Sequence, residues 1–201
     1  MSTKRTLARY MSANRDGLLW KAEGLDEYEM RLPRTATGTS LLGLVRHCLS
    51  VEYGYLVTCM GRTSSLVLPV VDYGSDPNGD FVVAEGETTD GLLQLYRDVG
   101  AEVDRSIKEV ALDAAARVPW WGDRGNTTFE RLLIHVLAEV ARHAGHADII
   151  REEIDGRVGM RKSGSGMWKP RGGWEAHVAR VQAAADVQRP AERRGGSAAA
   201  L

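Results

Sequence analysis

Three acid–base side chains recur along one face of a predicted helix in the second half of the chain. His135, Glu139 and His143 follow one another at intervals of four residues, which places them one above another on an α-helix. Imidazole and carboxylate groups four residues apart converge on one point, the usual placement of two metal ligands on a helix. Either His135 with Glu139 or Glu139 with His143 forms such a pair. A metal site here needs a further ligand from another element.

His47 is the histidine best placed to supply that ligand. It lies between Val45 and Cys48 in a strongly apolar segment. A histidine on such a helix is either a hydrogen-bonded core residue or a ligand that faces a neighbouring helix, and helical bundles build metal sites in the second way. Histidines and a glutamate at helical spacing also occur on salt-bridged or pH-responsive surfaces. Spacing alone leaves these interpretations open.

Four segments with helical periodicity would position these residues. They cover approximately residues 7–22, 40–60, 90–110 and 127–154. Thr39 or Ser40 is the expected N-cap of the second segment, and Thr127 or Thr128 that of the fourth, where Glu130 completes a capping box with Thr127. With few strand signals between them, these segments predict an all-α fold, a four-helix bundle.

The connections define the expected domain organisation. A long connection, residues 62–86, joins the second and third helices and is expected to cross over, with a short extended piece inside it. We expect the bundle domain to cover residues 1–157. A C-terminal extension, 158–187, offers a short helix near 174–185, and residues 188–201 are predicted to form a flexible, disordered tail.

Composition and charge exclude several function classes. Charged residues make up 26% and the net charge is −1, so a nucleic-acid-binding stripe is not expected. No apolar run approaches the roughly 20 residues that cross a bilayer, and the N-terminus lacks the apolar core of a signal peptide. We therefore expect a cytoplasmic protein without a membrane partner. Cys48 and Cys59, eleven residues apart on one predicted helix, lie too far apart for a disulfide.

Other polar residues near the predicted site have two interpretations each. His146 either lines the pocket or packs against a neighbouring helix, whereas His177 is expected at the surface. Glu52 is expected at the surface or in a salt bridge with Arg46, Arg142 or Arg151. Arg142 and Arg151 are alternatively candidates for contact with an anionic part of a substrate.

Two segments resemble, in order, the two motifs of the DinB-like superfamily. Residues 38–52, GTSLLGLVRHCLSVE, resemble the first motif, and residues 139–152, EVARHAGHADIIRE, resemble the second. Residues 20–25, WKAEGL, are similar to the mycothiol-dependent branch of the superfamily, whose mycothiol S-transferases the chain resembles. The resemblance extends through most of residues 5–160. It implies a four-helix bundle with a long crossover between the second and third helices.

The resemblance also implies a ligand set. In the superfamily one histidine of the second helix and an i, i+4 pair of the fourth hold a divalent metal, and the mycothiol branch uses Glu-x-x-x-His. By motif position the metal ligands are His47, Glu139 and His143, which would act in catalysis through the metal. Pairing of His135 with Glu139 is the alternative. If His135 is not a ligand, it is expected to be a core histidine or to form a hydrogen bond with one of the metal ligands.

The activity implied by the resemblance is metal-dependent thiol S-transfer. Mycothiol would be the low-molecular-weight thiol, activated as a metal-bound thiolate for attack on an electrophilic small molecule. Zinc is the expected metal, and nickel, iron, cobalt or manganese also suit histidine and carboxylate ligands. The alternatives are a thiol-dependent isomerase of the maleylpyruvate type and a non-catalytic, metal-stabilised ligand-binding bundle. The resemblance also suggests a homodimer.

Two segments depart from the family pattern and bear on the substrate. Tyr53-Gly54-Tyr55 stands where related sequences carry an aromatic pair, and Pro119-Trp120-Trp121-Gly122 precedes the fourth helix in a predicted loop. Trp120 and Trp121 either form a lid or wall over the pocket or pack at the end of the bundle.

Overall fold

The computed structural model describes residues 2–163 and 166–190. The chain separates into two compact units, Met1–Ser165 and Gly166–Leu201. The first unit contains the candidate site residues. The second contains the helix α6 (Gly173–Val187), close to its predicted position at 174–185. Of the predicted flexible tail, residues 191–201 lie outside the described residues.

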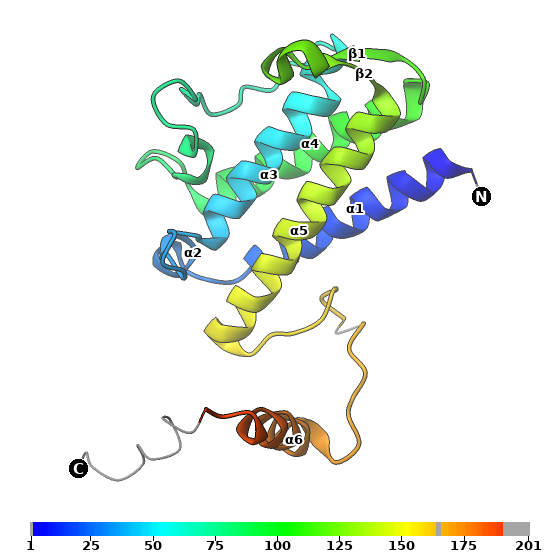
Figure 1. The fold of residues 1–201 in the computed structure, drawn as a ribbon. Coiled ribbons are helices and arrows are strands. Elements are labelled where there is room, and N and C mark those ends of the chain that lie inside the picture. Colours follow the sequence, from blue (N-terminus) through cyan, green and yellow to red (C-terminus); the bar gives the residue numbers. More distant parts are fainter. Residues whose placement is uncertain (1, 164–165, 191–201) are drawn as a thin grey trace. The chain divides into compact units, whose positions relative to one another are not determined.

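The first unit is mostly helical and carries one small two-stranded sheet (Figure 1). Its α-helices are α1 (Thr3–Ala22), α2 (Glu27–Arg31), α3 (Leu41–Leu56), α4 (Thr89–Glu109) and α5 (Phe129–Asp155). Its strands are β1 (Ala115–Arg117) and β2 (Asn126–Thr128), and short 3-10 helices occupy Thr58–Met60, Gly79–Phe81 and Pro119–Gly125. No helix within the described residues is both long enough and apolar enough to cross a membrane.

Side-chain caps set where the long helices begin. Ser2, Ser40, Thr88 and Thr128 each accept a hydrogen bond from the backbone N–H three residues ahead. Ser40 and Thr128 are two of the predicted caps. The predicted capping box with Thr127 is wrong, because β2 continues through Thr128 and α5 starts one residue later.

The segment with residues 119–122, predicted to be a loop, is a 3-10 turn between two short strands, so the all-α prediction is wrong in this region. Strands β1 and β2 pair antiparallel, with Ala116 opposite Thr127. The Val118 N–H donates to the Gly125 carbonyl at 2.9 Å and closes the turn. A Cβ on Gly125 would lie 2.3 Å from the Val118 carbonyl oxygen, so only glycine allows this approach. The strands are too short to produce a periodic signal in the sequence.

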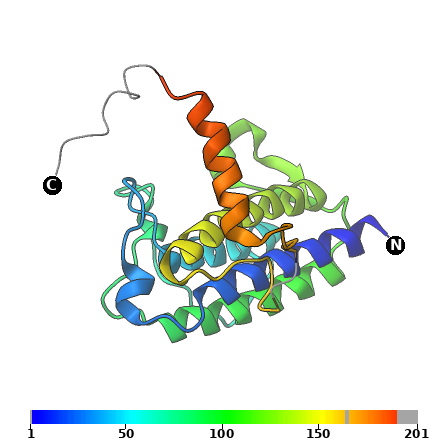
Figure 2. The ribbon, with the colours of Figure 1, turned by 90° about the horizontal axis from the view of Figure 1, so that it is seen from below.

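Four helices share the apolar core of the first unit. Helix α1 packs on α5, and α3 packs on both α4 and α5; α1 and α5 lie next to each other in Figures 1 and 2. Core side chains with at most 1% exposure come from all four helices: Met11, Leu18, Leu44, Leu49, Tyr96, Val103, Leu132 and Val136. This packing holds α3 and α5, which carry the candidate ligands, against each other.

A buried ion pair crosses this core. The Glu52 carboxylate accepts hydrogen bonds from Arg15 Nη2 at 2.6 Å and from the Tyr96 hydroxyl at 2.7 Å. Glu52 is completely buried and Arg15 nearly so. The predicted salt bridge therefore exists, but its partner is Arg15 of α1 and none of the three arginines that the sequence offered.

The connection between α3 and α4 packs back on α3 near the candidate site. Its 3-10 helix, Gly79–Phe81, contacts α3 directly. Gly43 permits this contact, since a Cβ there would lie 2.5 Å from the Phe81 carbonyl oxygen. The extended piece predicted within this connection forms no strand in the described part of the chain.

Candidate metal centre

The structure brings together the three residues that the motifs selected. His47 on α3 and Glu139 and His143 on α5 each offer one ligand atom, and these atoms all lie within 4.8 Å of one another. His143 Nε2 is 3.5 Å from Glu139 Oε2, and the rings of His47 and His143 have centroids 4.7 Å apart. All three side chains are partly buried. It is the one such group among the described residues.

Helices α3 and α5 run antiparallel along the seam that contains this centre. His47 faces His143, and eight residues further along α3 Tyr55 faces His135, eight residues earlier on α5. The ring centroids of Tyr55 and His135 are 5.0 Å apart. Each helix thus presents a histidine at the centre and an aromatic contact two turns away.

Two residues of the long connection complete the centre, and neither was among the predicted site residues. Asp80 Oδ2 lies 2.6 Å from His47 Nδ1 and also accepts a hydrogen bond from the Tyr73 hydroxyl at 3.3 Å. Phe81 stacks on the His47 ring with centroids 4.1 Å apart. One signal in the sequence pointed to Asp80: it is the last residue of a turn-forming stretch, residues 76–80. Asp80 lies 33 residues after His47, so nothing in the local spacing links the two.

Asp80 determines which nitrogen of His47 is available. Burial acts to raise the pKa of Asp80, but the hydrogen bonds with His47 and Tyr73 act in the opposite direction, and this pKa lies below its usual value. An ionised carboxylate accepts hydrogen bonds and donates none, so Nδ1 of His47 carries the proton. Its Nε2 is then the nitrogen with a free lone pair, as in the carboxylate–histidine pairs that orient metal ligands.

The buried position of His143 keeps its imidazole neutral. Burial, followed by the neighbouring His47, lowers the pKa of His143 from 6.5 to about 4. Metal ligation requires unprotonated imidazole, so this shift suits a ligand at neutral pH. His146 is exposed, and its Nδ1 lies 3.3 Å from Nδ1 of His143, so it lines the centre and does not pack in the core.

The donor set fits a divalent cation. Two imidazoles and one carboxylate suit zinc and its neighbours in the first transition row. Three protein ligands would leave coordination positions open, which is typical of catalytic rather than structural sites. His135 is not part of the group: its ring contacts Tyr55 and Trp121, so the alternative register is not supported.

Several other predicted candidates have structural roles. Arg151 is buried, pairs with Asp155 and donates to the carbonyl oxygens of Lys21 and Glu23, so the predicted contact with substrate is wrong. Arg142 is exposed on α5, and His177 lies on α6 in the second unit.

The two cysteines are not suited to nucleophilic attack. Both are free thiols, as predicted. Burial, and after it the charge of Glu52, raises the pKa of Cys48 well above its usual value. Burial also raises the pKa of Cys59. Since the thiolate is the reactive form, neither residue supplies a nucleophile at neutral pH.

Residues 6–156 match a protein-family model described as mycothiol-S-transferase. The matched range covers α1 from its fourth residue onward, all of α2 to α5 and the three residues of the centre. A search of curated proteins finds no match to the chain.

Proposed function

Because the chain belongs to the mycothiol S-transferase family, we propose that it conjugates mycothiol, through its thiol sulfur, to an electrophilic small molecule in a metal-dependent reaction. The observation that carries the proposal is the convergence of His47, Glu139 and His143 within 4.8 Å. We assign these residues as the metal ligands, and zinc as the metal. A divalent ion held by this set lowers the pKa of a thiol, which then reacts as a thiolate at neutral pH.

The fold assignment that accompanies this proposal follows the family. We assign α1, α3, α4 and α5 to a DinB-like four-helix bundle within residues 1–157, with the connection between α3 and α4 as its crossover. Residues 158–187 form an extension and residues 188–201 a tail in this assignment. It is supported by the shared core of the four helices and by the packing of the connection on α3.

Neighbouring residues keep the two histidines suited to binding a metal. Asp80 holds the Nδ1 proton of His47 and so directs Nε2 of the ring toward the centre. Phe81 stacks on one face of that ring and shields it from water. His143 remains neutral because it is buried, and Glu139 supplies one negative charge. With both cysteines excluded as nucleophiles, the incoming thiol is the nucleophile.

Metal analysis of the purified full chain tests the ligand assignment. We expect about one equivalent of a divalent metal in the wild type and its loss in His47→Ala and Glu139→Ala. His177→Ala is a matched control, since it removes a histidine remote in sequence from the centre. Circular dichroism would establish that each variant remains folded. Wild-type protein that neither holds nor takes up metal would refute the assignment.

A transfer assay tests the reaction. The protein is incubated with mycothiol and an alkyl halide, and thioether product is measured with and without a chelator. We expect metal-dependent thioether formation that is absent in His47→Ala. Isomerisation of maleylpyruvate without net consumption of thiol would show that the protein is an isomerase and not a transferase. Metal binding with neither activity would favour the non-catalytic ligand-binding bundle.

A further inference from the structure

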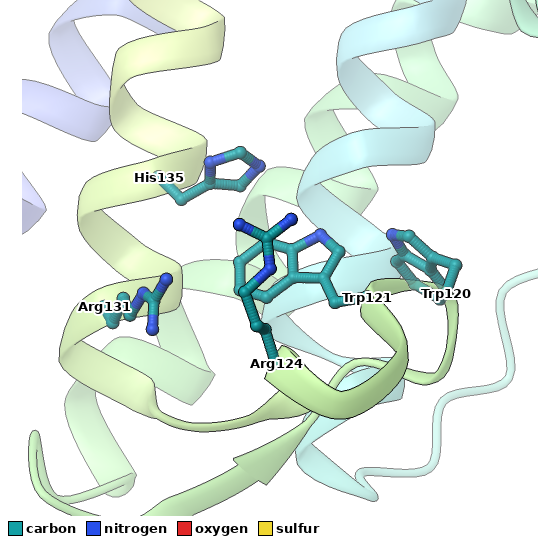
Figure 3. A pocket seen from close by; sticks show the side chains of 5 residues that line it. All are labelled: Trp120, Trp121, Arg124, Arg131 and His135. Carbon is teal, nitrogen blue, oxygen red and sulfur yellow. The ribbon is translucent and has the colours of Figure 1, made fainter.

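A cavity of about 380 Å³ lies at the end of the α3–α5 seam, beside the β1–β2 hairpin (Figure 3). Trp120, Trp121 and Arg124 line it from the turn of the hairpin, and Arg131 and His135 line it from the first turns of α5. The three candidate metal ligands are not among its lining residues. It is large enough for a small organic ligand.

The two arginines bring uncompensated positive charge to this cavity. Within the described ranges, neither Arg124 nor Arg131 forms a salt bridge, although Asp123 and Glu130 are their neighbours in the sequence. No acidic residue of the described chain lines the cavity. Two guanidinium groups at one opening favour an anion, and their planar donor geometry matches a carboxylate.

The aromatic lining is held in a defined orientation. The Tyr55 hydroxyl accepts hydrogen bonds from the indole N–H groups of both Trp120, at 2.9 Å, and Trp121, at 3.2 Å. The Trp121 ring stands edge-on to His135, and Arg131 lies 5.6 Å from the centre of the same indole. Indoles fixed in this way offer a preformed surface to a flat apolar group. The lining therefore suits an anion attached to an aromatic ring.

The cavity and the metal centre share one seam. His135 precedes His143 by eight residues on α5, and a rise of 1.5 Å per residue places them about 12 Å apart along the helix. The same separation holds between Tyr55 and His47 on α3. A molecule of that length, anchored in the cavity by one end, reaches the centre with the other.

We propose that this cavity binds the acidic, aromatic end of the electrophilic co-substrate. Arg124 and Arg131 hold its carboxylate and Trp121 contacts its ring, while the electrophilic carbon extends along the seam toward His47 and His143. The substrate class is thus an aromatic carboxylic acid whose reactive carbon lies on the order of 12 Å from the ring that Trp121 holds beside His135. The role of the ligand as a co-substrate rests on the proposed function, whereas its binding in the cavity does not.

Binding of 2-naphthoate to the full chain tests the inference, with uncharged 2-naphthamide as the matched ligand. Titration calorimetry should show 2-naphthoate binding at least about tenfold more tightly than the amide, and Arg124→Gln and Arg131→Gln should each weaken it by about tenfold. Arg117→Gln, which removes an arginine of β1 outside the cavity, should bind like the wild type. Equal affinity for acid and amide, or unchanged affinity in both cavity variants, would overturn the inference.

A second arm separates this inference from the proposed function. His47→Ala should bind 2-naphthoate with wild-type affinity, because the cavity does not include the metal centre. Binding without any transferase activity would refute the function and leave the cavity assignment standing. If transfer occurs, Arg124→Gln should raise KM for an acidic aromatic electrophile and leave KM for its amide unchanged. An active enzyme in which both KM values stay unchanged would overturn the inference alone.

Discussion

Replacing Asp80 with asparagine should weaken metal binding at the centre by about 10- to 100-fold. The carboxylate lies 2.6 Å from His47 Nδ1 and is 4% exposed, so little water is present to replace it. A hydrogen bond to a charged group contributes roughly 1.5–3 kcal/mol, and each 1.4 kcal/mol corresponds to about tenfold in affinity. The side chain introduced by Asp80→Asn would retain an acceptor oxygen for Nδ1 but not the charge. Asp80→Ala would remove both and should weaken binding further.

The affinity can be measured by competition between the metal-free protein and a chromophoric zinc chelator at pH 7.5. Asp76→Asn is the matched control, because it makes the same change in the same connection at an exposed position away from His47. Circular dichroism would exclude unfolding as the cause of a loss. An affinity of Asp80→Asn within twofold of the wild type would refute the reasoning that the Asp80 carboxylate orients His47 for metal binding.

Three further predictions concern stability. Folding lowers the pKa of His143 from 6.5 to about 4, so the neutral form of His143 stabilises the metal-free protein fully above pH 6.5 and less as the pH falls toward 4. The Tm of the wild type should therefore fall more between pH 7 and pH 5 than the Tm of His143→Gln. Equal decreases in Tm would contradict this prediction. Gly125→Ala should destabilise the protein by about 1–3 kcal/mol in urea, because its Cβ meets a backbone oxygen, whereas Gly54→Ala on α3 has open space and should not destabilise it. Glu52→Ala leaves Arg15 buried without its main partner and should cost about 3–5 kcal/mol, so an unchanged denaturation midpoint would count against the buried ion pair.

The order of the long helices could be predicted from the sequence because periodic apolar positions and capping residues are local signals. Ser40 and Thr88 begin α3 and α4 through hydrogen bonds to residues three positions ahead, and Gly156 ends α5 in a left-handed conformation. Such interactions involve neighbouring residues, so residue types at fixed spacing reveal them. The short elements α2, β1 and β2 were missed, since three to five residues carry too little of a period to be detected.

The candidate ligands could also be predicted from the sequence. Glu139 and His143 form an i, i+4 pair that any helix would bring together, and motif resemblance linked His47 to them across 92 residues. Spacing alone could not choose between His135 and His143. In the tertiary structure the antiparallel register of α3 and α5 places His47 opposite His143 and Tyr55 opposite His135, so His143 and not His135 joins the cluster.

The surroundings of the candidate ligands could not be predicted from the sequence. Asp80 reaches His47, and Tyr55 binds both indoles of the hairpin, through chain segments with no periodic relation to their partners. The cavity with its two guanidinium groups depends on how the hairpin turn folds against α5. The long helices and the residue types of the candidate metal site could thus be predicted, because both follow from local spacing. The partners that orient the site and the cavity beside it follow from packing between distant segments, which local spacing does not encode.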